Sequence, residues 1–201
     1  MNDGRKKNGV TDIVLVGVFS ALVFAASWLQ INIPTPLGNT RIHLGNVLCL
    51  LSGFLLGALR GGTAAGLGSM LFDFTSPIFI TSAPFTLVFK FIMGFLCGLL
   101  GARVRSPGVR DTVCKVAAAV TGQLAYIALY LAKGYWWDAI LIKGASAEIA
   151  WADVIVTKAP VSLFNGVLAV VISVPLALAL QKTLKGTPLY GKFLMGRKDG
   201  T

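Results

Sequence analysis

Four ionisable residues lie inside or beside apolar stretches of this sequence: Arg41, His43, Asp73 and Lys90. Such groups are costly at membrane depth, so they normally face a protein interior or an aqueous cavity. Opposite charges drawn from separate helices supply both donors and acceptors, which suits the capture of a small polar molecule. These residues therefore predict a polar pocket inside a largely apolar chain.

Further polar and aromatic residues are expected at the same face of the protein. A few fixed polar groups orient a ligand and aromatic walls bury its ring, so the set favours a nitrogen heterocycle. The candidate substrate-binding residues are Arg41, His43, Asn46, Asp73, Lys90, Tyr130, Trp136 and Asn165.

Simpler interpretations of these residues stay open. Asp73 and Lys90 can neutralise each other as a structural pair. The tyrosines and tryptophans of residues 126–137 can be anchors at the membrane interface. Lys158 is expected to extend its amine outward from the membrane.

The sequence offers little for catalysis. It has no Ser-His-Asp grouping with a credible base, no HExxH motif and no paired carboxylates on one span. The glycines of residues 57–68 are not followed by the Gly-Lys-Ser/Thr of a phosphate loop. The three cysteines lack CxxC spacing and the single histidine lacks partners at ligand spacing. We expect no enzyme, no cofactor and no metal site, and we expect Asp138, Glu148 and Asp153 to be solvated.

Composition indicates an integral membrane protein. Of the 201 residues, 55% are hydrophobic and 13% are charged, whereas a soluble domain carries about a quarter charged residues. The net charge of +10 is spread over short segments that flank apolar runs. No basic patch with interleaved aromatic residues is present, which argues against nucleic-acid binding.

The apolar runs predict an all-α fold: a single domain, residues 1–201, formed by a six-transmembrane-helix bundle. Three loops are expected on the outer side, at residues 30–43, 75–83 and 133–153, and Arg60 is expected in a tight cytoplasmic turn. The expected spans are residues 10–29, 44–59, 61–74, 84–100, 113–131 and 154–180, followed by a basic cytoplasmic tail at residues 181–201. A re-entrant hairpin in place of the second and third spans is the alternative. A cleaved signal peptide is disfavoured, because the first apolar run exceeds the usual signal core.

The basic residues predict the orientation. Most of the 18 lysines and arginines fall in the proposed inner segments, and positive charge concentrates in cytoplasmic loops. Both termini are therefore expected in the cytoplasm, which requires an even number of crossings.

The first span carries Gly17, Ala21 and Ala25 at four-residue intervals. This spacing puts three small residues on one helix face, where another helix can approach closely. The spacing alone does not decide whether that helix belongs to this chain or to a partner.

Several of these features together resemble one family of membrane proteins. They are the six short spans, the small-residue face of the first span, and the sequence from Arg41 to Asn46 after an outer loop. The glycine-rich stretch 57–68, Ser69-x-x-x-Asp73, and Pro84-x-Thr86 followed by Lys90 and Gly94 complete the set. The chain resembles the substrate-binding S component of an energy-coupling factor (ECF) vitamin transporter.

The resemblance implies a multi-pass protein of the bacterial plasma membrane that captures a vitamin or cofactor precursor from outside. It implies partners as well: one transmembrane coupling protein and two cytoplasmic ATPase subunits. Ala21 and Ala25 match the family's Ala-x-x-x-Ala docking motif, and residues 30–43 would form a lid over the site.

The identity of the substrate stays open at this point. A hydroxymethylpyrimidine, pyridoxine, a flavin and a deazaguanine-type precursor all suit an Asp, a Lys and several aromatic residues. Two rival functions also stay open. One is a self-sufficient secondary transporter that uses Asp73 and Lys90 as its coupling site, although no internal repeat supports it. The other is a membrane enzyme or an assembly scaffold.

Overall fold

The computed structural model describes residues 3–102 and 108–184, with all their side chains except those of residues 3–8 and 38. Arg103, Arg105 and most of the expected cytoplasmic tail lie outside these ranges. In chain order the elements are α1 (Asp3–Ser27), β1 (Gln30–Thr35), β2 (Gly38–His43), α2 (Gly45–Leu56), α3 (Ala58–Thr75), the 3-10 turn η1 (Ile80–Ser82), α4 (Ala83–Gly101), α5 (Val109–Lys133), the π-helical η2 (Gly134–Ile142), α6 (Ala147–Asp153), the π-helical η3 (Val154–Lys158) and α7 (Ala159–Leu184).

The fold is a helical bundle, as the apolar runs predict. Among the described residues, four helical stretches are long and apolar enough to cross a membrane: Gly9–Ser27, Ile80–Gly101, Val109–Ile142 and Ala147–Leu184. The apolar helix α2 has only 12 residues. That the chain crosses the membrane six times therefore stays a prediction.

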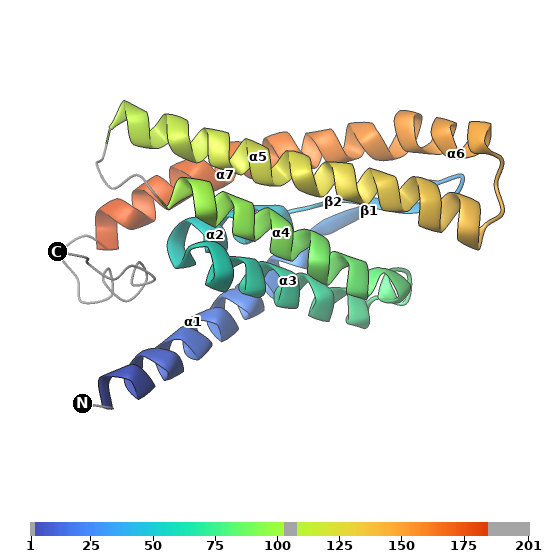
Figure 1. Cartoon of the computed structure of the whole chain (residues 1–201). Coiled ribbons are helices and arrows are strands. Elements are labelled where there is room, and N and C mark those ends of the chain that lie inside the picture. The colour runs from blue at the N-terminus through green and yellow to red at the C-terminus, as the bar shows by residue number, and fades with distance from the viewer. Residues whose placement is uncertain (1–2, 103–107, 185–201) are drawn as a thin grey trace.

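The helices are arranged so that both described ends of the chain lie together. In Figure 1, the first turns of α1 and the last turn of α7 lie at one end of the bundle, and α6 lies at the other. Helix α3 runs along α4, α4 along α5, and α5 along α7, while α1 crosses α3. The arrangement is compatible with termini on one side of the membrane.

The expected outer loop at residues 30–43 is an ordered β-hairpin. Strands β1 and β2 pair antiparallel, with Gln30 opposite His43 and Thr35 opposite Gly38. Pro36 and Leu37 form the connecting turn. The prolines at positions 34 and 36 concealed this hairpin in the sequence, because proline is unusual inside strands and is tolerated at edges.

The turn between α2 and α3 is at Gly57 and not at Arg60, so that expectation was wrong. Gly57 has φ +80°, a conformation that glycine adopts without steric cost. Arg60 lies inside α3, where its Nη1 contacts Asp12 Oδ1 of α1 at 2.6 Å. The ion pair links the first turns of α3 to α1.

The expected outer loop at residues 133–153 is mostly helical, which corrects a second boundary. Helix α5 continues through η2 to Ile142, and α6 starts at Ala147. Ser146 caps α6 by accepting a hydrogen bond from the backbone N–H of Ile149. The polar and aromatic composition of this stretch suggested a loop, whereas packing on its neighbours makes it helical.

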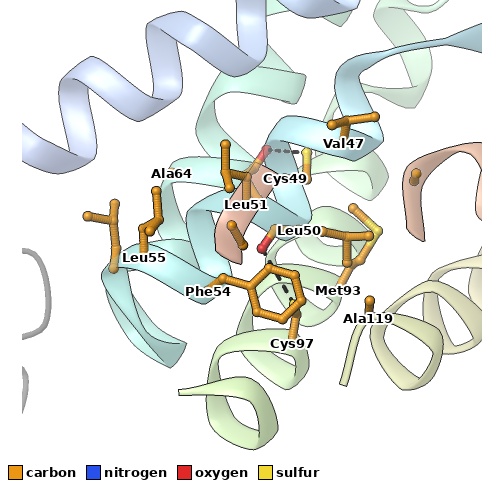
Figure 2. Packing of buried hydrophobic residues seen from close by; sticks show 14 of the residues in the cluster. Val47, Cys49, Leu50, Leu51, Phe54, Leu55, Ala64, Met93, Cys97 and Ala119 are labelled. Carbon is orange, nitrogen blue, oxygen red and sulfur yellow. Dashed lines mark hydrogen bonds between the residues drawn. The ribbon is translucent and has the colours of Figure 1, made fainter. Parts of the chain in front are cut away.

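The apolar core surrounds α2. Figure 2 shows Leu50 and Phe54 of α2 beside Met93 and Cys97 of α4, and all four side chains are buried. The Sγ of Cys97 lies 3.5 Å from the carbonyl oxygen of Leu50. The two cysteines of the core, Cys49 and Cys97, are free and buried, as expected for small apolar residues.

Two glycines of α3 allow its close packing on α4. A Cβ atom at Gly62 would lie 2.8 Å from the carbonyl oxygen of Phe91, and one at Gly66 would lie 2.7 Å from that of Leu87. The absence of a side chain at Gly62 and Gly66 therefore lets the backbones of α3 and α4 approach closely. This contact sets α3 against α4 at the site described next.

Candidate functional site

A polar cavity of about 60 Å³ lies between β2 and the helices α3, α4, α5 and α7. Five of the expected site residues line it: Arg41, His43, Asp73, Tyr130 and Asn165. Its other lining residues are Asn39, Thr40, Phe79, Ser82, Phe85, Thr86, Phe89, Tyr126, Lys133, Asp138 and Ser162.

Asp73 is the central acceptor of the cavity. Its side chain is 1% exposed, and its Oδ1 accepts a hydrogen bond from Arg41 Nη2 at 2.6 Å. Thr86 Oγ1 donates to Oδ2 at 2.5 Å. The carboxylate is thus held by groups from β2 and α4. Asp73 and Lys90 do not form the neutralising pair that the sequence left open.

Lys90 is buried behind the cavity wall. Its amine donates to Asn46 Oδ1, and its Nζ lies 3.9 Å from the centre of the Tyr126 ring. Lys90 and Asn46 are absent from the cavity lining, whereas Tyr126 lines it. Lys90 therefore contacts a residue of the cavity wall without lining the cavity itself.

The hairpin covers the cavity and is fastened to the helices through β2. Asn165 Nδ2 of α7 donates to the carbonyl oxygen of Arg41 at 2.7 Å, and its Oδ1 accepts from the backbone N–H of His43 at 3.1 Å. One amide side chain thus pairs with the strand edge as a neighbouring strand would. Tyr130 of α5 donates to Thr40 Oγ1 at 3.1 Å.

His43 is the only histidine of the chain and is buried at the end of β2. Its Nδ1 accepts a hydrogen bond from the backbone N–H of Gly45 at 3.1 Å. Burial, followed by the nearby charges of Lys90 and Arg41, holds the pKa of His43 well below its usual range. The ring is therefore neutral at physiological pH.

Eleven lining residues were missed as binding candidates from the sequence, among them Thr86, Lys133 and Asp138. Lys133 Nζ donates to Ser82 Oγ at 2.7 Å and pairs with Asp138 Oδ1 at 2.7 Å. Lys133 lies three residues after Tyr130, on the same face of α5. That helical spacing was the available signal, and the expected end of the span at residue 131 concealed it.

Trp136 is not brought to the cavity. It is 63% exposed and packs edge-on against Tyr135, with ring centres 5.2 Å apart. This arrangement fits the alternative role of the aromatic cluster as an interface anchor.

The expectations for Lys158 and Asp153 were wrong. Lys158 is 2% exposed and its Nζ lies 3.2 Å from Asp153 Oδ2, so it does not extend outward. Asp153 is buried as well, and its Oδ1 accepts from the backbone N–H of Leu37 at 3.4 Å. The pair thus contacts the tip of the hairpin.

A second concave surface lies between α1 and α3, on a different side of α3. It is an apolar groove of about 810 Å³, lined by Asp12, Ile13, Val16, Gly17, Ser20, Ala21, Phe24, Thr63, Leu67, Leu71 and Thr75. Gly17, Ala21 and Ala25 are all exposed, and a Cβ atom at Gly17 would meet nothing within 4 Å. The small-residue face of α1 is therefore not used for packing within the described part of the chain.

The described residues thus combine four helical stretches of membrane-spanning length with a polar cavity. The chain belongs to the family described as "ECF-type riboflavin transporter, S component", whose sequence model matches residues 7–182. This family is a class of transporter components and not a class of enzymes.

The chain is also similar to curated proteins of known sequence and to one solved structure. The chain is 33% identical over 108 residues to "UPF0397 protein YdcD" of Lactococcus lactis subsp. lactis (strain IL1403). This alignment covers 54% of each of the two chains. The chain is 40% identical over 68 residues to a "UPF0397 protein" of Lactococcus lactis subsp. cremoris (strain NZ9000), in an alignment that covers 34% of this chain and 37% of the relative. These matches span about half the length of the curated relatives, or less.

A solved structure described as "Structure and mechanism of the S component of a bacterial ECF transporter" has the same fold. The TM-score is 0.56 at 15% identity, and the alignment covers 87% of this chain and 97% of that one. At this identity the likeness concerns the fold alone.

Proposed function

We propose that this protein is the substrate-specific binding subunit of an ECF-type importer and captures a vitamin or cofactor precursor in the cavity beneath the β1–β2 hairpin. The observation that carries the proposal is Asp73, a buried carboxylate in a cavity within a membrane-helix bundle of this family. Buried ionisable groups at membrane depth are costly and usually functional.

The chemistry of the lining favours a nitrogen heterocycle. Asp73 and Asn165 provide acceptors, Arg41 and Lys133 provide donors, and Tyr126 and Tyr130 stack with their ring centres 6.0 Å apart. A heterocycle uses both kinds of polar group along its edges and packs its faces on aromatic rings. Riboflavin, which the family description names, is the first compound to test.

The proposed setting is the bacterial plasma membrane, with six crossings and both termini in the cytoplasm. The proposed partners are a transmembrane coupling protein, which contacts the α1 face at Gly17, Ala21 and Ala25, and two cytoplasmic ATPase subunits. The exposure of all three small residues supports a contact outside this chain.

Native mass spectrometry of the detergent-purified protein tests the proposal. We expect a co-purified small molecule at one copy per chain, or riboflavin retained after it is added. A protein that retains neither riboflavin nor any other heterocyclic vitamin from a panel contradicts the proposed function.

A self-sufficient secondary transporter is the alternative, with Asp73 and Lys90 as its coupling site. It has less support, because Arg41 and Thr86 occupy Asp73 while Lys90 contacts Asn46. Liposomes that contain this chain alone distinguish the two functions. Substrate accumulation driven by an ion gradient, without partner subunits, favours the alternative.

A further inference from the structure

The cavity is much smaller than the ligand that its chemistry suits. It measures about 60 Å³, whereas pockets for small organic ligands commonly measure about 300–1,000 Å³. A ring system therefore requires that a lining side chain move aside. Arg41 is the long side chain that the hairpin contributes, and it is 13% exposed, so it has a route outward.

The guanidinium of Arg41 is held as a planar ligand would be. Its central carbon lies 4.2 Å from the centre of the Phe79 ring and 5.1 Å from that of Phe72. Its edge donates to Asp73 Oδ1 at 2.6 Å. Aromatic rings against a planar group, with a carboxylate at the edge, also make a binding site for a flat molecule with N–H donors.

The fit of Arg41 in this place is incomplete. Its Nη1 is buried and has no hydrogen-bond partner among the described residues. Buried donors in native proteins are nearly always paired, and an unpaired one is unfavourable. The space beside Asp73, Phe72 and Phe79 accommodates a planar group with N–H donors. It does not provide a hydrogen-bond acceptor for every N–H group of an arginine.

We propose that Arg41 is the resident occupant of the substrate site. Its guanidinium lies where the planar, hydrogen-bond-donating edge of the substrate binds, and the substrate displaces it from Asp73. The inference rests on the proposed function and deepens it, because it names the part of the substrate that Asp73 recognises. That part is a ring edge with N–H donors, such as that of an aminopyrimidine.

When the substrate displaces Arg41, the Asp73 carboxylate stays paired, with Arg41 in the empty protein and with the substrate in the complex. A buried charge that loses its partner is strongly destabilising, so an empty site without Arg41 would be less stable. The backbone of Arg41 is held by Asn165, which allows the side chain to leave while β2 stays in place. The substrate thus replaces a side chain of the lid and not a water-filled void.

Thermal unfolding of the detergent-purified full-length protein tests the inference with two planar donor probes, methylguanidinium and 2,4-diaminopyrimidine, each at millimolar concentration. Arg41→Ala removes the guanidinium from beside Asp73, and the double variant Arg41→Ala/Asp73→Asn also removes the carboxylate acceptor. Arg60→Ala is the matched control, because it removes another arginine that pairs with an aspartate, Asp12, outside the cavity. We expect both probes to raise the Tm of Arg41→Ala by several degrees and to change the wild type, the control and the double variant far less.

Three results overturn the inference: no response from Arg41→Ala, a response to methylguanidinium alone, or an equal response from the wild type. Methylguanidinium alone would mean that the place fits only an arginine. If Arg41→Ala does not fold, Arg41→Lys keeps a cation but not the planar fork. That variant should bind 2,4-diaminopyrimidine at least tenfold more tightly than the wild type, and equal binding overturns the inference.

Riboflavin binding separates this inference from the proposed function. Probe binding without retention of any vitamin contradicts the function and leaves the inference standing. If the wild type binds riboflavin tightly and Arg41→Ala binds it at least tenfold more weakly, the proposed function is supported and the inference is contradicted. Arg41 would then bind the substrate and would not be displaced by it.

Discussion

The polar cavity and the apolar groove are two concave surfaces that share one helix, α3. Asp73 faces the cavity, whereas Thr63, Leu67, Leu71 and Thr75, spaced four residues apart, face the groove. The cavity is more enclosed and is lined by hydrogen-bonded and ion-paired side chains, whereas the groove is more open and offers small and apolar side chains. The comparison teaches that one region is built for hydrogen bonding and the other for close apolar packing. A change on one face of α3 should leave the function of the other intact.

The largest expected effect comes from filling the groove. Gly17→Trp/Ala21→Trp should abolish substrate uptake in cells that contain the partner subunits, because bulky rings prevent a helix from approaching α1. The substrate Kd of the purified protein should stay within about a factor of two, since neither residue lines the polar cavity. Uptake of labelled substrate and calorimetric titration measure the two properties.

The matched control for this variant is Val18→Trp/Leu22→Trp. Both residues are exposed on α1 and absent from the groove lining. An equal loss of uptake in the control, or a loss of binding in the groove variant, contradicts the separation of the two surfaces.

The next effect is on the cavity. Asp73→Asn should weaken substrate binding at least tenfold, about 1.4 kcal/mol, because a neutral amide cannot pair with a cationic or strongly donating group as a carboxylate does. Asp111→Asn is the control, since Asp111 is a buried aspartate of α5 that pairs with Lys115. Both variants should lower the Tm, but only Asp73→Asn should lower the affinity. Unchanged affinity would return Asp73 to a structural role.

The sequence predicted the apolar helices and several cavity residues for clear physical reasons. Ionisable residues such as Asp73 stand out against an apolar background, and their cost in a membrane points to a site. The face of Gly17, Ala21 and Ala25 is likewise visible in its four-residue spacing.

Other features of the site depend on contacts that no local pattern contains. The pairing of Asp73 with Arg41, in place of Lys90, follows from where β2 crosses the bundle. The hairpin was concealed because Pro34 and Pro36 are poor strand residues. Lys133 was placed in an outer loop because the span was expected to end at residue 131. Lys158 was expected to extend its amine outward because its pairing with Asp153 is not visible in the sequence.

A smaller effect is expected at the fastening of the hairpin. Asn165→Leu removes the partners of the Arg41 carbonyl and of the His43 N–H, and each buried unpaired group costs about 1–3 kcal/mol. The amide of His43 should exchange its hydrogen faster, as measured by hydrogen–deuterium exchange, and substrate affinity should fall several-fold. Ser173→Ala is the control, because Ser173 is a buried polar residue of the same helix that does not line the cavity. Unchanged exchange at His43 would show that Asn165 does not hold the strand.

The smallest effect concerns pH. The pKa of His43 is lowered in the folded state, so the unfolded chain binds the proton more readily. The contribution of the neutral ring to stability is then full above pH of about 6.5 and is lost as the pH falls below it. Between pH 7.5 and 5.5 the Tm of the wild type should fall more than that of His43→Gln. Parallel pH profiles would contradict this assignment.

Hydrogen–deuterium exchange of the purified protein, with and without its substrate, tests the central claim most directly, because it locates the binding site by region. We predict that the substrate slows exchange in residues 38–43, in the end of α3 around Asp73 and in the first turns of α4. The groove-facing residues 12–21 of α1 should not change. Protection confined to α1 and the groove, with none at β2 or Asp73, would contradict the assignment of the polar cavity as the substrate site.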